Sequence, residues 1–505
     1  MTDGRVTLGE LEAHLWESAN ILRGPVDQAD FKSYVFPLLF LKRISDVYDE
    51  EFRQALEESE SDVGYAGLAE NHRFQIPDKA HWSELRERTE NVGQAIQSAM
   101  RAIEQANPAK LYGIFGDTQW TNKERLSDAL LRDLVDHYSK LPLGNLRVEP
   151  DILGNAYEYL IKKFADLSKK KAGEFYTPRS VVKMLVNVLD PEEGETAYDP
   201  ACGTGGMLIE VVQHVKDQGG RAQLQWGKVF GQEKNLTTAG IARMNLFLHG
   251  VEDFEVVRGD TLREPAFFVG DELATFDCVI ANPPFSLKKW GEEVWAADRF
   301  GRNFAGVPPK KSGDFAWVEH MVKSMAAKSG RLAVVLPQGA LFRGAAEKRI
   351  RRSLLEADLI EAVIGLAPNL FYGTSLAACV MVLRQRKAPD HRRRVLVVDA
   401  STLFKRGRKQ NTLEDEHRER IEALYAGFAD EEGFAYVADL DEIASNEFDL
   451  NIGRYVAPAG EEEPPTLAET TEKLKAALKE ADAAEEHLLE LLKAEGLIDE
   501  RGVAT

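Results

Sequence analysis

The sequence predicts an α/β protein: a doubly wound, mostly parallel β-sheet, with an N-terminal helical domain before it and a C-terminal helical tail after it. From about Thr196, short apolar segments of strand length alternate with segments long enough for helices, which is typical of a sheet covered on both faces. Before that point apolar residues recur at helical spacing, and after Tyr455 a linker rich in Pro and Glu leads into a heptad-like stretch. We therefore expect three parts, at residues 1–150, 151–455 and 456–505.

The helical domain is expected because apolar residues repeat every three or four positions in its sequence. They do so over residues 8–22 and 31–48, and the same spacing continues over residues 126–138 and 152–167. No strand-like pattern interrupts these segments, so we expect a separate domain made of helices.

Seven apolar segments are expected to be the strands of the sheet: TAYDP, KVFGQE, FEVVRGD, FDCVIANPP, RLAVVLP, LIEAVIG and AACVMVL. The first four carry a polar residue at or just after their end, namely Asp199, Glu233, Asp260 and Asn282. In doubly wound sheets, ligands bind at the carboxyl ends of the strands. We therefore expect one binding site built from these four strand ends.

The composition is typical of a cytosolic protein without a membrane span, a disulfide or a metal centre. No apolar stretch is long enough to cross a bilayer, and the N-terminus MTDGRVTLGE lacks the features of a signal peptide. Cys202, Cys278 and Cys379 lie far apart, which indicates reduced core thiols. The ten histidines show no metal-ligand spacing.

Charge is unevenly distributed along the chain. The net charge of −20 would repel nucleic acid, so a nucleic-acid enzyme of this composition must concentrate its positive charge or borrow it from a partner. Residues 384–409 contain ten Lys and Arg against two Asp, whereas residues 459–505 contain thirteen Asp and Glu against five Lys and Arg. In the tail, apolar residues recur every seven positions at Leu467, Leu474, Ala481 and Leu488. This helix packs either on its own domain or on a helix of a partner.

The segment DPACGTGG, residues 199–206, is expected to form a tight turn between the first strand and a helix. Its glycines let the backbone approach a ligand, and the helix N-terminus offers unpaired N–H groups. At the next two strand ends, the Glu233 carboxylate can accept both hydroxyls of a ribose, and Asp260, followed by Thr261, can accept an adenine amino group. These features together favour a bound adenosine group, although the glycine spacing differs from that of dinucleotide-binding proteins.

The fourth strand end, NPPF, is the segment that predicts a reaction. Pro283 and Pro284 stiffen the loop and leave carbonyl oxygens free, because proline has no N–H. The Asn282 side-chain oxygen and the Pro283 carbonyl can both accept hydrogen bonds from one exocyclic amino group. Two such acceptors favour the positive charge that develops when that nitrogen attacks an electrophile. Phe285 can stack on a base that has left the duplex.

These motifs, in this order, resemble those of DNA methyltransferases that transfer a methyl group from S-adenosylmethionine to an amino group. The set comprises GEFYTP at residues 173–178, DPACGTGG, GQE, GDTL and NPPF. Further segments are similar to methylation subunits of type I restriction-modification complexes: KSYVFPLLFLKRISDVY, GRLAVVLPQGALF, NLFYGTSLAACVMVL and FDLNIGRY. The resemblance covers the chain from about residue 7 to residue 455.

The resemblance implies a class I S-adenosylmethionine methyltransferase fold, which is Rossmann-like, for the part at 151–455, and adenine N6 in double-stranded DNA as the methyl acceptor. It assigns the cofactor to Glu174, Phe175, Tyr176, Thr177, Pro178, Asp199, Ala201, Gly203, Thr204, Gly205, Glu233, Asp260 and Thr261. It assigns the flipped adenine to Asn282, Pro283, Pro284 and Phe285, with no metal. It also implies three partners: a specificity subunit that reads the DNA sequence, a second copy of this chain, and a restriction subunit for cleavage. The tail at 456–505 would then serve assembly.

Other interpretations remain open on the sequence alone. Cytosine N4 and the amide of a protein glutamine also present a conjugated amino group, and a scaffold could bind cofactor or DNA without methylating it. The helical domain and the basic stretch after NPPF favour DNA. In that stretch, residues 286–312, basic and aromatic residues are interleaved, as in a mobile loop that closes over a nucleotide or in an ordinary surface loop.

Overall fold

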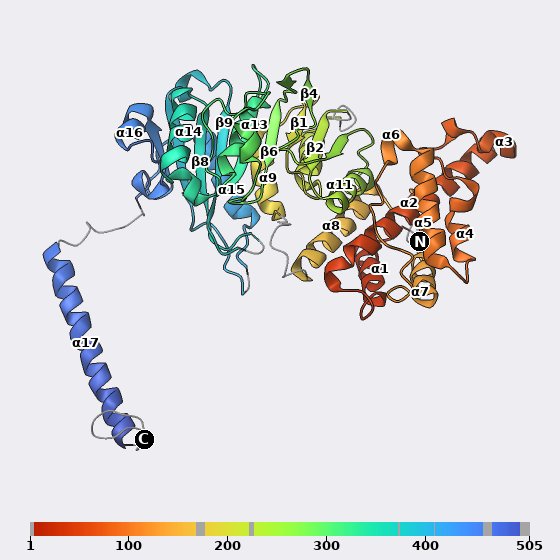
Figure 1. Cartoon of the computed structure of the whole chain (residues 1–505), viewed down its shortest axis with the longest axis horizontal. Coiled ribbons are helices and arrows are strands. Elements are labelled where there is room, and N and C mark those ends of the chain that lie inside the picture. Colours follow the sequence, from red (N-terminus) through yellow and green to blue (C-terminus); the bar gives the residue numbers. More distant parts are fainter. Residues whose placement is uncertain are drawn as a thin grey trace. The chain divides into compact units, whose positions relative to one another are not determined.

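The computed structural model describes residues 5–167, 177–221, 227–371, 374–408, 410–457 and 467–494. The chain forms two compact units, Met1–Val456 and Ala457–Thr505. The first unit contains a helical part, drawn in red and orange in Figure 1, and a sheet part, drawn from yellow to blue. Among the residues described, no helix combines the length and apolarity needed to cross a membrane.

The helical part begins at a well-capped helix. Thr7 caps it, since its hydroxyl accepts from the Glu10 N–H and the Glu10 carboxylate accepts from the Thr7 N–H in return. The predicted helical periodicity is confirmed over residues 8–22, 31–48, 126–138 and 152–167. The helices are α1 (Leu8–Ile21), α2 (Lys32–Glu58), α3 (Val63–Ala66), α4 (Trp82–Arg86), α5 (Val92–Ala106), α6 (Pro108–Leu111), α7 (Asp128–Ser139) and α8 (Pro150–Leu167). The apolar faces of all these helices except α3 pack in one core.

The sheet part contains a nine-stranded sheet with the order β11-β10-β8-β9-β7-β6-β1-β2-β3. Its strands are β1 (Ala197–Asp199), β2 (Val229–Glu233), β3 (Glu255–Arg258), β6 (Cys278–Ala281), β7 (Arg331–Pro337), β8 (Ile360–Leu366), β9 (Ala378–Arg384), β10 (Arg394–Ala400) and β11 (Ala435–Asp439). The strands from β3 to β7 in this order are parallel, as are β8 and β10, whereas β9 and β11 run antiparallel to their neighbours. The expected mostly parallel sheet is confirmed. A separate hairpin joins β4 (Phe268–Val269) to β5 (Glu272–Leu273).

Two strands extend the sheet beyond the seven that the sequence predicts. β10 lies inside the basic stretch at 384–409, and β11 pairs with it antiparallel. The sheet therefore does not end at AACVMVL, the last of the predicted strands, but continues to Asp439. The segment RVLVVDA forms β10. Because arginines occupy positions 392–394, at and just before the start of this apolar run, the sequence pattern does not predict a strand there.

Helices cover both faces of the sheet because successive strand residues point to opposite sides. Cys278 and Ile280 of β6 face one core, and Val279 and Ala281 face the other. The first face is covered by α9 (Arg179–Leu189), α10 (Gly206–Asp217) and α15 (Asp415–Gly427). The second is covered by α13 (Asp314–Lys323), α14 (Ala345–Glu356) and α16 (Leu440–Ser445).

Helix α11 (Leu236–Leu248) joins the helical part to the sheet part. Ile241, Met244 and Phe247 are buried in the core of the helical part, whereas Ala242 and Leu246 of the same helix pack in a cluster with β2 and α10. One helix thus carries two apolar faces, each buried against a different part of the first unit.

The second unit contains α17 (Leu467–Ala494). Its described leucines are largely exposed, with Leu474 at 59% and Leu491 at 51%. The expected helix is therefore present, with an exposed apolar stripe.

Candidate functional site

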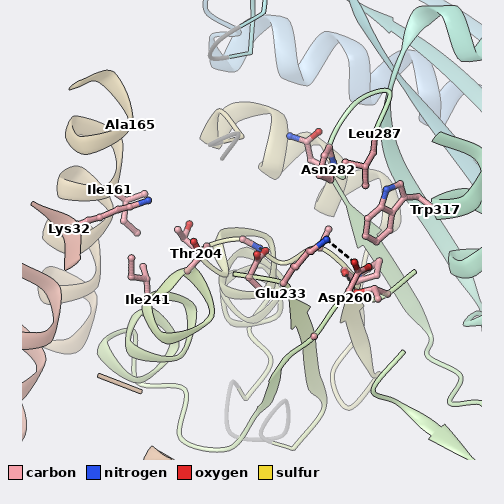
Figure 2. A pocket seen from close by; sticks show the side chains of 18 of the residues that line it. Lys32, Ile161, Ala165, Thr204, Glu233, Ile241, Asp260, Asn282, Leu287 and Trp317 are labelled. Atoms are coloured by element: carbon pink, nitrogen blue, oxygen red, sulfur yellow. Dashed lines mark hydrogen bonds and ion pairs between the residues drawn. The ribbon is translucent and has the colours of Figure 1, made fainter. Parts of the chain in front are cut away.

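A pocket of about 210 Å³ lies at the edge of the sheet where the first four strands end (Figure 2). Eight of the predicted site residues line it: Ala201, Gly203, Thr204, Glu233, Asp260, Thr261, Asn282 and Pro284. Four distant segments therefore meet at one site, as the strand pattern predicts. Glu174, Phe175 and Tyr176 lie outside the described residues. Thr177, Pro178, Asp199, Gly205, Pro283 and Phe285 are described but do not line the pocket.

The glycine-rich turn runs from β1 into α10. Gly203 and Gly205 have left-handed backbones, with φ of +54° and +83°, which side chains other than glycine rarely adopt. The Gly203 N–H donates to the Glu233 carboxylate at 3.2 Å, and the Thr204 carbonyl accepts from the side chain of Asn245 at 3.0 Å. The turn is thus held to β2 and to α11.

Asp199 lies beneath this turn. Its carboxylate accepts from the Ala201 N–H at 2.9 Å, and its side chain is buried. Burial raises the pKa of the Asp199 carboxyl to about 8; the Ala201 hydrogen bond opposes the rise and the Glu233 carboxylate adds to it. Near neutral pH the neutral form of this group therefore predominates.

The other two acids stand at the ends of β2 and β3. Glu233 also accepts from the Asn235 N–H at 2.7 Å, which orients its carboxylate across the end of the strand. Asp260 forms an ion pair with Lys234 at 2.8 Å. The Thr261 hydroxyl donates to the Pro200 carbonyl at 2.6 Å, so the segment after β3 is tied to the glycine-rich turn.

The Asn282 amide at the end of β6 has a fixed orientation. Its Nδ2 donates to the Thr177 hydroxyl at 2.9 Å. Its Oδ1 is buried, and no hydrogen bond reaches it from any part of the chain that the structure describes. A buried acceptor without a donor is costly, so this oxygen is suited to receive an N–H from a ligand.

The segment after Phe285 is clamped to a buried ionic cluster. Ser286, which has a left-handed backbone, donates its N–H to Asp314 at 2.7 Å. Asp314 is 1% exposed and pairs with Arg343 at 2.7 Å. The Ser312 hydroxyl donates to Asp314 at 3.0 Å. This cluster fixes the direction in which the chain leaves NPPF.

The composition of the stretch at 286–312 allows a mobile loop or an ordinary surface loop, and in the structure three of its four aromatic side chains are buried. Trp290, Trp295 and Phe300 are buried side chains, and the two tryptophans pack with Leu262 in one cluster. Arg302 is buried too. It pairs with Asp298 at 2.6 Å and donates to the Thr261 and Leu262 carbonyls, both at 3.0 Å. The side chains of this stretch that remain exposed include Lys288, Lys289, Arg299, Phe304, Lys310 and Lys311.

Twelve further residues line the pocket and are not predicted from the sequence. Helices α2 and α8 contribute Lys32, Phe36, Ile161, Phe164 and Ala165, and the sheet part adds Pro200, Lys234, Thr238, Ile241, Gly259, Leu287 and Trp317. No local signal distinguishes the residues from α2 and α8, because their role depends on packing between segments far apart in the chain.

Two family models match the chain, each over one part of it. The model described as N-6 DNA Methylase matches residues 148–464, and the model described as HsdM N-terminal domain matches residues 11–138. Together they cover the sheet part and the helical part in the order that the sequence analysis expects.

The chain is also similar to curated methylase subunits of type I restriction enzymes. The methylase subunit of type I restriction enzyme MjaVII from Methanocaldococcus jannaschii is 34% identical, with 93% of this chain and 81% of that protein covered. The methylase subunit of type I restriction enzyme HindI from Haemophilus influenzae is 30% identical, with 80% of this chain and 95% of that protein covered.

A solved structure shares most of the architecture. The crystal structure of a type I restriction-modification methyltransferase subunit from Streptococcus thermophilus aligns with a TM-score of 0.77 at 32% identity. The alignment covers 90% of this chain and 100% of that one. The predicted fold class is thereby confirmed, and of the interpretations that the sequence left open, the adenine-specific DNA methyltransferase is the one supported. The chain belongs to the N-6 DNA methylases, in the family of type I restriction-modification methylase subunits.

Proposed function

We propose that the pocket binds S-adenosylmethionine and that the chain uses it to methylate N6 of an adenine flipped out of DNA. One observation carries the proposal: the Asn282 amide is oriented by Thr177 so that a buried, unsatisfied oxygen remains, as judged over the described residues. An amino group of a base is a donor that this oxygen can accept.

The described residues fit the proposed cofactor. Glu233 at the end of β2 suits the ribose hydroxyls, and Asp260 at the end of β3 suits the adenine amino group, since carboxylates accept hydrogen bonds from both. A side chain at Gly203 would meet no neighbouring atom of the described chain, so this stretch of backbone faces open space that a ligand can occupy. We assign the remaining cofactor contacts to Ala201, Thr204, Gly205 and Thr261, with Glu174, Phe175, Tyr176, Thr177 and Pro178 completing the site.

The chain's contribution to the reaction is chiefly positioning. S-adenosylmethionine supplies an electrophilic methyl group on a positively charged sulfur. Asn282 Oδ1 and the Pro283 carbonyl would accept the two hydrogens of the adenine amino group, stabilising the positive charge that grows on its nitrogen. Pro284 stiffens the loop, and Phe285 would stack on the base. The Phe285 ring packs edge-on to the Phe371 ring, with 6.0 Å between the two ring centroids. The surplus proton can leave to water.

We further propose that the chain works on DNA only within an assembly. The net charge of −20 opposes DNA binding by the chain alone, so a partner must supply part of the attraction. A specificity subunit, a second copy of this chain and a restriction subunit are the partners that the resemblance implies. The exposed leucines of α17 offer a helical surface for one of them. With chromosomal DNA as the substrate, the cytosol is the place of action.

The test compares Asn282→Ala with Asn187→Ala, the same change on α9 outside the pocket. Each variant is co-expressed with the neighbouring specificity subunit, and the DNA is sequenced by a method that detects N6-methyladenine. We expect Asn282→Ala to lose about 100- to 1,000-fold in methylation rate, while retaining cofactor binding by calorimetry, and Asn187→Ala to act as wild type.

Equal methylation by both variants would remove Asn282 from the site. Methyl groups on cytosine or on protein, with none on adenine, would overturn the choice of acceptor. Cofactor binding by a well-folded complex with no methylated product would favour the scaffold interpretation.

A further inference from the structure

The pocket has a second wall that does not come from the sheet. Lys32 and Phe36 of α2, together with Ile161, Phe164 and Ala165 of α8, line it from the helical part. The site is therefore built jointly by two parts of the first unit.

Several contacts hold this wall against the sheet edge. The Tyr157 hydroxyl of α8 donates to the Ile241 carbonyl of α11 at 3.3 Å, and Ile241 itself lines the pocket. Arg243 of α11 donates to the Lys110 carbonyl at 2.7 Å. Because α11 also buries Phe247 in the helical core, the position of the wall relative to the strand ends is fixed by packing as well as by hydrogen bonds.

The two walls differ in charge. Among the described lining residues from α2 and α8, Lys32 is charged and the others are apolar. The sheet edge instead presents the carboxylates of Glu233 and Asp260. Figure 2 shows Glu233 between Asp260 and Thr204, with the Lys32 side chain beyond Thr204 on the far side of the pocket.

The proposed cofactor is also asymmetric. Its adenosine end offers hydroxyl and amino donors, which suit carboxylates, whereas its amino-acid end is a zwitterion, and Glu233 and Asp260 would repel the carboxylate of that zwitterion. If the adenosine lies at the acidic strand ends, the amino-acid end extends toward Thr204 and the helical wall. At the helical wall, Lys32 lies beside apolar side chains. Because water screens charges less in such surroundings, the attraction between the Lys32 ammonium and the cofactor carboxylate would be strong.

We propose that Lys32 pairs with the carboxylate of S-adenosylmethionine, so that the helical part completes the cofactor site. This inference rests on the proposed function. The competing receptor for that carboxylate is the N-terminus of α10, where no side chain of the described residues forms a capping hydrogen bond.

The experiment measures binding of two ligands to the full chain by calorimetry. The ligands are S-adenosylmethionine and decarboxylated S-adenosylmethionine, which keeps the adenosine, the sulfonium and the amine. We expect Lys32→Gln to weaken binding of the first ligand roughly 10- to 100-fold and binding of the second less than about threefold. Lys32→Arg should recover most of the affinity for the first ligand. Unchanged binding of the decarboxylated ligand also shows that the variant is folded.

Lys234→Gln is the matched control. It removes one positive charge from the same pocket, but Lys234 pairs with Asp260 at the other end, so both ligands should be affected equally. An equal loss for both ligands in Lys32→Gln, or no loss for either, would overturn the assignment and point to α10. Failure of the wild-type chain to bind either ligand would instead overturn the proposed function.

Discussion

Replacing Asp298 by Asn tests whether the buried ion pair beneath the pocket stabilises the catalytic part. The Asp298 and Arg302 side chains are 5% and 1% exposed, and one carboxylate oxygen of Asp298 accepts from both Nε and Nη2 of Arg302, at 2.9 and 2.6 Å. The other oxygen accepts from the Arg302 N–H at 2.8 Å. An amide has one acceptor oxygen, so Asp298→Asn leaves either the guanidinium or the backbone N–H without its partner.

The expected cost follows from this burial. Removing one partner of a buried ion pair destabilises a protein by about 3–5 kcal/mol, because a charge remains in a medium that solvates it poorly. Arg393 and Asp441 form a pair of similar length, 3.0 Å, but their side chains are 63% and 91% exposed. Asp441→Asn should therefore cost about 0–1 kcal/mol.

Urea denaturation followed by tryptophan fluorescence measures both values. Trp290, Trp295 and Trp317 belong to one cluster beside Arg302, so the signal reports on this region. We also expect weaker cofactor binding in Asp298→Asn, because Arg302 holds the Thr261 and Leu262 carbonyls next to the pocket. The reasoning is refuted if the two variants lose the same free energy of unfolding within about 1 kcal/mol.

Two further predictions concern the site. Cofactor binding should strengthen as the pH rises from about 6 to about 9, because burial raises the pKa of Asp199 to about 8 and a cationic ligand favours its charged form. In the free chain the same raised pKa makes the free energy of unfolding fall as the pH rises from about 4 to about 8. With rising pH, calorimetry should therefore show tighter cofactor binding, whereas denaturation should show lower stability. Both trends should be absent in Asp199→Asn. Asp314→Ala should lower kcat about 10- to 100-fold with little change in cofactor affinity, since Ser286 loses its acceptor and Arg343 its partner while the pocket lining stays intact. Steady-state kinetics would contradict this if KM for the cofactor rose as much as kcat fell.

The sequence is sufficient to predict seven of the sheet's nine strands and the meeting of the polar ends of the first four. Strand length and apolar content are local properties, as is the polar residue at the end of each of these four strands, and the edge at which the four ends meet follows from parallel pairing. For this reason the amino-acid sequence alone places Glu233, Asp260 and Asn282 at one site, and all three line the pocket.

Features that depend on distant packing cannot be predicted in the same way. β10 is not predicted, because arginines precede its apolar run in the sequence. Its burial depends on pairing with β8 and β11, which the local sequence does not indicate. Charged residues surround Trp290 and Trp295 in the sequence, which is typical of surface aromatic residues, yet both side chains are buried. Arg302 is buried as well, where it pairs with Asp298, four residues before it. Lys32 becomes part of the site only through the docking of the helical part on α11.

The double-faced packing of α11 restricts how the chain can be recombined. A chimera that takes the helical part from one relative and the sheet part from another would have to match Ile241, Met244 and Phe247 to a foreign core, although those residues lie within the sheet part by sequence. If the crossover were placed between the helical part and the sheet part in the sequence, the apolar contact between α11 and the foreign helical core would therefore be mismatched beside the pocket. Chimeras that exchange α11 together with the helical part carry the matching face with them, at the expense of a new seam against β2 and α10.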